Sequence, residues 1–106
     1  MRVTVSHNQP KQEVIRRIDQ SLDEVFKSIG NGFIQIANER RLWSGDRLDF
    51  SFSAVTGFMT LPVKGFVLVE DTQATIDIDL PAFVGNFIPE QKMTQGIESK
   101  VKALLT

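Results

Sequence analysis

The fold is decided by residues 43–80, which read WSGDRLDFSFSAVTGFMTLPVKGFVLVEDTQATIDIDL. In residues 48–53 and again in residues 74–80, every second residue is apolar and the residues between them are polar. A period of two is typical of strands that bury one face and expose the other to water. The stretch therefore predicts a sheet with one apolar face, which helices from the rest of the chain can cover.

Turn residues divide this stretch into strands. Ser44-Gly45-Asp46 predicts a β-hairpin between Trp43 and residues 48–50, and residues 71–73 lead into a last strand at 74–80. Residues 56–70 form either one long strand bent near Pro62 and Gly65 or two short ones. Ahead of the hairpin we predict a strand only at residues 40–43, because residues 33–39 fit a strand, a helix or a loop.

The flanking segments predict one more strand and two helices. Residues 2–6 are short and β-branched, as in a strand. Asn8 and Pro10 are typical of a helix start, and Gly30-Asn31-Gly32 of a helix end. The apolar stripe of this first helix is Val14, Ile18, Leu22, Val25 and Ile29. The stripe of a closing helix, from Pro89 to Leu105, is Met93, Ile97, Val101 and Leu104. We therefore expect an α+β fold, with an antiparallel sheet of about four to five strands and two helices on one face, in the order strand-helix-strands-helix.

Length and composition limit the class of protein. A chain of 106 residues predicts one domain, residues 1–106. The longest apolar runs fall short of the roughly 18 residues that span a membrane, and the N-terminus lacks a signal-peptide pattern, so a soluble cytoplasmic protein is expected. A net charge of -1 argues against a nucleic-acid partner, and the absence of cysteine excludes disulfides and thiol chemistry.

Few residues suggest catalysis or metal binding. His7 is the only histidine and sits just before a helix start, which favours capping or packing over catalysis. Asp77 and Asp79 could pair at a metal, but neighbouring acids on the polar face of a strand more often serve solubility. Arg40-Arg41 is too small a basic spot for a nucleic-acid footprint. We expect no enzyme activity, no catalytic residue, no metal and no cofactor.

Some apolar residues remain once the core face is filled. If Val67 and Val69 face the helices, Phe66 and Leu68 point to the other side, where Phe58 can join them. A strand buried on both sides or a homodimer interface is the favoured explanation, and a surface for a hydrophobic partner is the alternative. A second candidate is the apolar run before the last helix, which contains Phe83 and Phe87. It forms either a lid or simply the corner of the core.

The layout resembles the polyhydroxyalkanoic acid system family, small bacterial proteins of the polyhydroxyalkanoate granule region. The matching features are His7 before an amphipathic helix, the hairpin Trp43-Ser44-Gly45-Asp46, the strand of residues 65–69 with Glu70-Asp71, Leu80-Pro81, and a closing helix. The resemblance implies association with storage-polyester metabolism and a polyhydroxyalkanoate granule or its proteins as partner. It transfers no catalytic residue.

The layout also resembles a reduced helix-grip domain, in which a C-terminal helix crosses a curved sheet and leaves a pocket. Trp43, Phe50, Phe52 and Met93 are then candidate pocket walls, although filling the core is their more frequent role. Our leading hypothesis is a non-enzymatic accessory or binding protein of polyhydroxyalkanoate metabolism. The alternative is an intracellular carrier of an apolar, acyl-type ligand. A hydrolase that acts on the polymer is the weakest hypothesis, because the sequence shows no nucleophile and base at a catalytic spacing.

Overall fold

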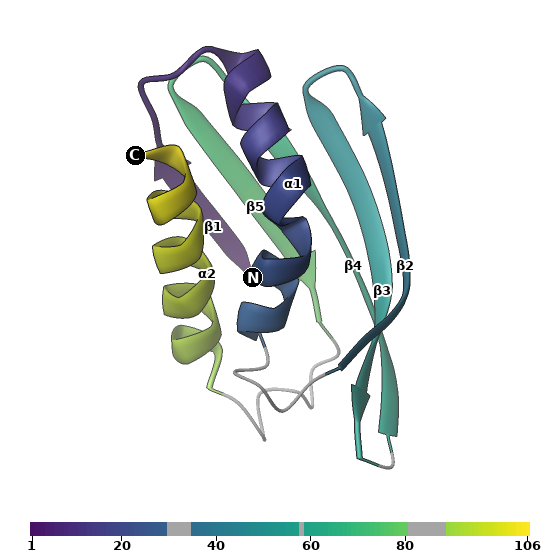
Figure 1. Cartoon of the computed structure of the whole chain (residues 1–106). Helices are drawn as coiled ribbons and strands as arrows, with labels where there is room; N and C mark the ends of the chain where they lie inside the picture. Colours follow the sequence, from purple (N-terminus) through teal and green to yellow (C-terminus); the bar gives the residue numbers. More distant parts are fainter. Residues whose placement is uncertain (30–34, 58, 81–88) are drawn as a thin grey trace.

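The computed structural model describes residues 1–29, 35–57, 59–80 and 89–106. Within these ranges, two helices and five strands follow one another: β1 (Arg2–Ser6), α1 (Lys11–Ile29), β2 (Gln35–Ser44), β3 (Arg47–Thr56), β4 (Met59–Val69), β5 (Gln73–Asp79) and α2 (Glu90–Leu105). The strands form one antiparallel sheet in the order β1-β5-β4-β3-β2, with both helices on the same side (Figure 1). The predicted α+β class is therefore confirmed. These features alone do not identify a helix-grip domain.

The sheet is a meander with one added edge. Strands β2 to β5 pair with their neighbours in sequence, whereas β1, the first strand of the chain, pairs with β5, the last. Helix α1 makes the connection from one edge of the sheet to the other, and α2 then packs beside α1 and over β1 (Figure 1). A helix that links the two edges must cross a face of the sheet, so the helical layer lies on that face.

One strand boundary differs from the prediction, and the structure decides between two alternatives that the sequence left open for another strand. Strand β2 begins at Gln35, well before the predicted residue 40, and an irregularity between Ala37 and Arg40 explains why its pattern does not alternate cleanly. Residues 59–69 form one strand rather than two. Strand β5 pairs only with residues 64–69 of β4, so Pro62 lies beyond that ladder and its missing N–H breaks no bond to β5.

The start of α1 also differs from the prediction. The helix begins at Lys11, and the carbonyl of Pro10 accepts hydrogen bonds from the amides of Glu13 (3.0 Å) and Val14 (3.1 Å). Asn8 is exposed, and its side chain makes no hydrogen bond in the described part of the chain, so the predicted capping role for Asn8 is wrong. The backbone of the residue before the helix supplies the acceptor instead.

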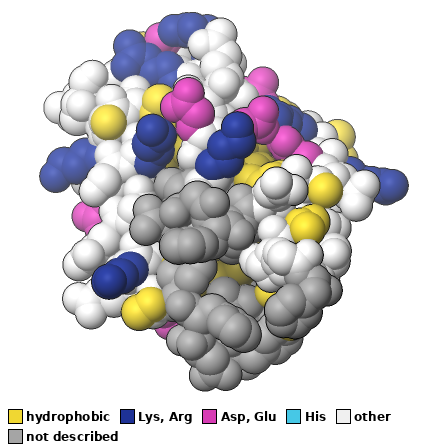
Figure 2. Space-filling model, turned by 60° about the horizontal axis from the view of Figure 1, so that its bottom comes forward, with side chains coloured by type: hydrophobic (Ala, Val, Ile, Leu, Met, Phe, Trp, Pro, Cys, Tyr) yellow, Lys and Arg dark blue, Asp and Glu magenta, His cyan; other side chains and the backbone are white. Residues whose placement is uncertain are grey.

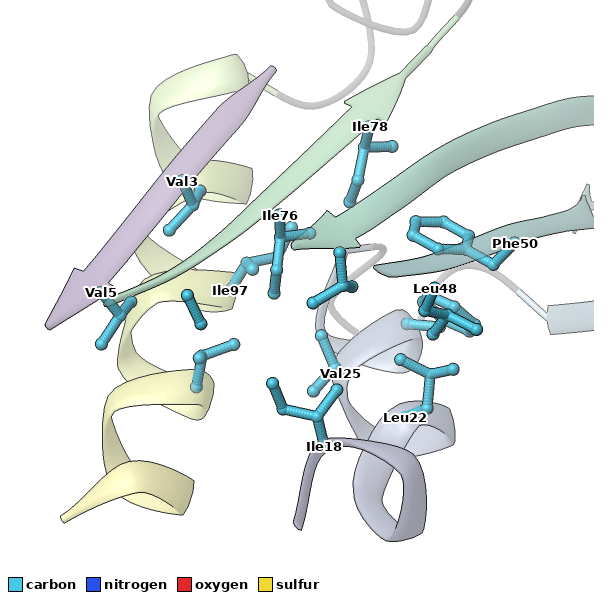
Figure 3. Packing of buried hydrophobic residues seen from close by; sticks show 14 of the residues in the cluster. Val3, Val5, Ile18, Leu22, Val25, Leu48, Phe50, Ile76, Ile78 and Ile97 are labelled. Carbon is cyan, nitrogen blue, oxygen red and sulfur yellow. The ribbon is translucent and has the colours of Figure 1, made fainter. Parts of the chain in front are cut away.

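The core lies between the sheet and the two helices. Apolar side chains from β1, β3, β5, α1 and α2 point toward one another in this layer (Figure 3). The buried residues of α1 include Val14, Ile18, Leu22, Val25 and Phe26, and those of α2 are Met93, Ile97, Val101 and Leu105. The predicted stripe of α2 ends at Leu104, but the buried side chain there is Leu105. Three phenylalanine rings anchor one end of the core, since Phe26 contacts Phe50 at 4.7 Å and Phe52 at 4.6 Å between ring centroids.

Candidate functional site

The face of the sheet that points away from α1 and α2 is called the open face here. On β4, residues 63, 67 and 69 are buried beneath the helices, and the even-numbered residues between them face the other way. Phe66 and Leu68 therefore lie on the open face, as the alternation predicts. Both are half-buried by neighbouring side chains, and no described helix or strand covers them.

A third apolar side chain belongs to the same surface. Leu42 of β2 pairs with Asp49 of β3, and Asp49 in turn pairs with Phe66 of β4, so Leu42 and Phe66 lie on one row across the sheet. Among the described residues, Leu42 is the one large apolar side chain that is mostly exposed, at 67%. We call Leu42, Phe66 and Leu68 the apolar patch. Sequence reasoning missed Leu42, although its position next to Trp43, which faces the helices, was the available signal.

Charged side chains surround the apolar patch. The guanidinium carbon of Arg47 lies 4.1 Å from the centroid of the Phe66 ring, and Arg47 also donates hydrogen bonds to Asp49. On the other side of Phe66, Arg2 donates a 2.9 Å hydrogen bond to Asp77. Asp77 thus forms an ion pair with Arg2. The sequence had suggested Asp77, together with Asp79, as a metal ligand or a solubility residue. The open face is amphiphilic, with apolar side chains set among ion pairs.

Basic and acidic side chains are interleaved elsewhere on the surface as well, with apolar side chains visible between them (Figure 2). On α1, Glu13 accepts hydrogen bonds from both Arg16 and Arg17. The hydrogen bond from Arg16, followed by that from Arg17, lowers the pKa of Glu13 from its ordinary value of 4.5 to about 2. Such alternation agrees with a net charge close to zero.

Three of the predicted pocket residues lie on the helix side of the sheet. Phe50 and Phe52 are each 4% exposed and pack against Phe26. Trp43 is half-buried, and its indole Nε1 donates a 3.0 Å hydrogen bond to Oδ1 of Asp19 on α1. These rings therefore face away from Phe66 and Leu68. The predicted site residues Phe58, Phe83 and Phe87 lie outside the described residues.

The two adjacent arginines of β2 face opposite sides. Arg41 points to the helix side, where it contacts Asp19, Asp23 and Glu39, and Arg40 lies on the open face opposite Ser51. Burial raises the pKa of Glu39, and a hydrogen bond with Asp23 raises it further. The single basic spot that the sequence suggested is therefore divided between two faces.

His7 lies at the corner between β1 and α1 and is 4% exposed. Its Nδ1 accepts a hydrogen bond from the amide of Gln9 at 3.2 Å, and its Nε2 lies 2.8 Å from the carbonyl oxygen of Glu70. A carbonyl can only accept, so Nε2 carries the proton and the ring is in the neutral Nε2–H form. Both nitrogens thus hold the corner together.

The described ranges offer neither a metal cluster nor a membrane span. No group of three or more His, Cys, Asp or Glu side chains within them could hold a metal ion. Neither helix of those ranges is long and apolar enough to cross a membrane.

Comparison with known proteins gives a family and two distant structures. No curated protein sequence matches the chain. The structure of the quaternary ammonium Rieske monooxygenase CntA, in complex with an inhibitor, aligns with all of this chain and 40% of its own, at 10% identity and a TM-score of 0.42. TTHA0849 from Thermus thermophilus aligns with all of this chain and 99% of its own, at 14% identity and a TM-score of 0.37. Likeness at this level carries no argument about function.

The family comparison covers nearly the whole chain. Residues 1–105 match the family described as "Putative polyhydroxyalkanoic acid system protein". The match extends from β1 to the end of α2, so it includes both faces of the sheet. The chain therefore belongs to the polyhydroxyalkanoic acid system protein family.

Proposed function

We propose that this protein is a non-enzymatic accessory protein of the polyhydroxyalkanoate system, and that it attaches to the storage-polyester granule through the apolar patch. The observation that carries the proposal is the position of Leu42, Phe66 and Leu68 on a sheet face that no described element covers. Membership of the polyhydroxyalkanoic acid system family is the reason for proposing this polymer as the partner. We place the protein in the cytoplasm, the compartment in which a granule would be accessible to it.

The chemistry of the surface suits a polyester. A polyhydroxyalkanoate surface presents aliphatic groups together with ester carbonyls, which accept hydrogen bonds but do not donate them. The apolar patch offers contact area to the aliphatic groups. Arg47 and Arg2, which border Phe66 and its neighbour Asp77, offer N–H donors to the carbonyls. A face with both groups fits an ester surface better than a purely apolar face would.

Attachment rather than catalysis is supported by the engagement of His7. The only imidazole in the chain is buried, and both of its nitrogens already have hydrogen-bond partners at a structural corner. A histidine that acts as a general base needs a free ring nitrogen within reach of its substrate. The role proposed for the protein is accordingly one of binding.

The alternative of an acyl carrier receives less support. It requires a ligand pocket between the sheet and α2, next to Trp43, Phe50 and Phe52. Phe50 and Phe52 instead pack against Phe26, and the Trp43 indole bonds Asp19. Phe50 and Phe52 thus contact a ring of α1, and Trp43 is hydrogen-bonded to α1.

Co-sedimentation with purified native granules tests the proposal. Wild type should pellet with the granules, and a Phe66→Ser/Leu68→Ser variant should stay in the supernatant. The matched control is Val55→Ser, another half-buried apolar residue of the open face. It lies eight positions beyond Arg47, the partner of Leu68, or about 27 Å along the strand. The control should pellet like wild type.

Three results would overturn the proposal. The first is equal pelleting of wild type and the Phe66→Ser/Leu68→Ser variant, when both show cooperative thermal unfolding. The second is loss of pelleting in Val55→Ser alone. The third is a wild type that sediments as a stable dimer without granules and becomes a monomer in the double variant, because the apolar patch would then be a homodimer interface.

A further inference from the structure

A groove lies on the open face next to the apolar patch, where β2, β3, β4 and the end of β5 come together. Its volume is about 510 Å³. Its lining on the open face includes Arg40, Ser51, Lys64, Asp79, Pro62 and Leu80. Arg40 is two residues from Leu42 and Lys64 is two residues from Phe66, so groove and patch are neighbours on one surface.

Register brings the charged groups of the groove into one row. Arg40 pairs with Ser51, Ser51 pairs with Lys64, and Lys64 pairs with Asp79. Two cations thus flank one hydroxyl across three neighbouring strands. Directly paired positions in a sheet lie about 5 Å apart, so Arg40 and Lys64 are about 10 Å apart across Ser51, a gap that their long side chains can span toward one bound anion.

The two cations of this row form no ion pair with the described part of the chain. Within the described ranges, neither Arg40 nor Lys64 has an ion-pair partner, and no ion pair joins Lys64 to the neighbouring Asp79. Arg2 and Arg47, the other arginines of the open face, are both paired with aspartates. Among the described residues of the open face, Arg40 and Lys64 are therefore the cations that lack an ion-pair partner.

A bulge in β2 places the arginine there. Between Ala37, opposite Ser53, and Arg40, opposite Ser51, β2 advances three residues while β3 advances two. Regular pairing would set Glu39 opposite Ser51. The extra residue, at a point where Asn38 has a φ of 55°, turns Glu39 to the helix side and Arg40 into the groove. β-Bulges often re-aim a side chain at a binding site.

The other residues that line the groove indicate which further groups a ligand can have. Pro62 and Leu80 supply apolar surface, and Asp79, at the end of the row, can accept a hydrogen bond from a hydroxyl group. Asn38 and Ser53 add further polar atoms, with Asn38 donating to Ser53 at 3.4 Å. An arginine with a lysine and a hydroxyl nearby is a carboxylate-binding set.

We infer that this groove binds the carboxylate of a short hydroxyalkanoic acid, with the carboxylate on Arg40 and Lys64 and the hydroxyl group toward Asp79. The choice of hydroxyalkanoate rests on the proposed function, because such acids are the units of the polyester. Two sources share this chemistry, the free acid and the carboxyl end of a polymer chain.

Titration of the full chain with sodium 3-hydroxybutyrate, followed by amide NMR shifts, tests the inference. Shifts should concentrate at Arg40, Ser51 and Lys64. The uncharged methyl ester of the same acid should give none. Arg40→Gln and Lys64→Gln should each weaken binding by about tenfold, the effect of removing one charge-assisted contact. Lys102→Gln, which removes an exposed cation of α2 outside the groove, should bind like wild type.

Several results would overturn the inference: equal shifts with acid and ester, unchanged affinity in both groove variants, or phosphate binding as tightly as 3-hydroxybutyrate. Failure of this inference can be told apart from failure of the proposed function. The Phe66→Ser/Leu68→Ser variant should no longer bind granules but should still bind 3-hydroxybutyrate. Excess free acid that releases wild type from granules would identify polymer chain ends as the source. If excess free acid leaves the pelleting of wild type unchanged, the source of the groove's ligand is the free acid.

Discussion

Along β4, odd-numbered residues face α1 and α2, and even-numbered residues face away from them. Val67 is fully buried on the helix side, while its neighbours Phe66 and Leu68 on the open face keep part of their surface in water. The same strand thus packs the core through one set of side chains, and the other set belongs to the face that we propose binds the granule. Because the two sets alternate, the open face can change its chemistry without loss of the core. Stability should therefore depend on one face and binding on the other.

The largest expected difference between the faces compares two phenylalanines. Phe26→Ala removes a fully buried ring that contacts Phe50 and Phe52, and should cost about 3–5 kcal/mol in the free energy of unfolding. Phe66→Ala removes a half-buried ring of the open face and should cost about 1 kcal/mol. Urea unfolding measures both. Similar costs for the two variants would contradict the division between the faces.

A glycine on the helix side gives the next effect. A Cβ at Gly65 would lie 2.8 Å from Cζ of Phe50 and would collide with the backbone oxygen of Asp77, so Gly65→Ala should cost about 3 kcal/mol. Gly45→Ala is the matched control, because its Cβ would meet open space. Its cost should be about 1 kcal/mol, from the positive φ of 62° alone. Thermal unfolding of both variants checks the order, and a more harmful Gly45→Ala would contradict it.

A smaller effect is expected within the open face. Arg47 lies over the Phe66 ring, and an exposed cation–π contact contributes about 0.5–1 kcal/mol. A double-mutant cycle with Arg47→Ala and Phe66→Ala should therefore return a coupling of about 0.5 kcal/mol. Additive effects of the two substitutions would show that the stacking contributes nothing to stability.

The smallest effect concerns the outer surface of α1 and depends on pH. The pKa of Glu13 is lowered to about 2 in the folded protein, so the unfolded chain binds more protons at this group between pH 2 and 4.5. Its contribution is complete above pH 4.5 and is lost as pH falls toward 2. Glu13→Gln should unfold at a lower temperature than wild type at pH 6, and the gap should close near pH 2. A gap that persists at pH 2 would exclude this ion pair as its cause.

The sequence predicted the parts of the fold in which burial is one-sided and regular. Strands β3 and β5 show a clean period of two, and the stripe of α1 keeps helical spacing from Val14 to Val25, because each element meets the core with one continuous face. The assignment of Phe66 and Leu68 to the face opposite Val67 followed from the same period.

Irregular pairing explains what the sequence did not predict. The bulge after Ala37 shifts the alternation of β2 by one residue, which hid the length of that strand. The groove depends on the registers of β2 with β3, β3 with β4 and β4 with β5 together. Those registers are set by contacts between distant residues, which no local pattern contains.

The position of β1 beside β5 has a consequence for the order of assembly. Strands β2 to β5 can pair as successive hairpins, each closing a short loop, whereas the β1–β5 ladder joins Arg2 to Asp77. During synthesis on a ribosome, β1 has no partner strand until residues 73–79, which form β5, have left the exit tunnel. We therefore expect this ladder to form late and to limit the folding rate, with the apolar side chains of Val3 and Val5 exposed to other chains in the meantime.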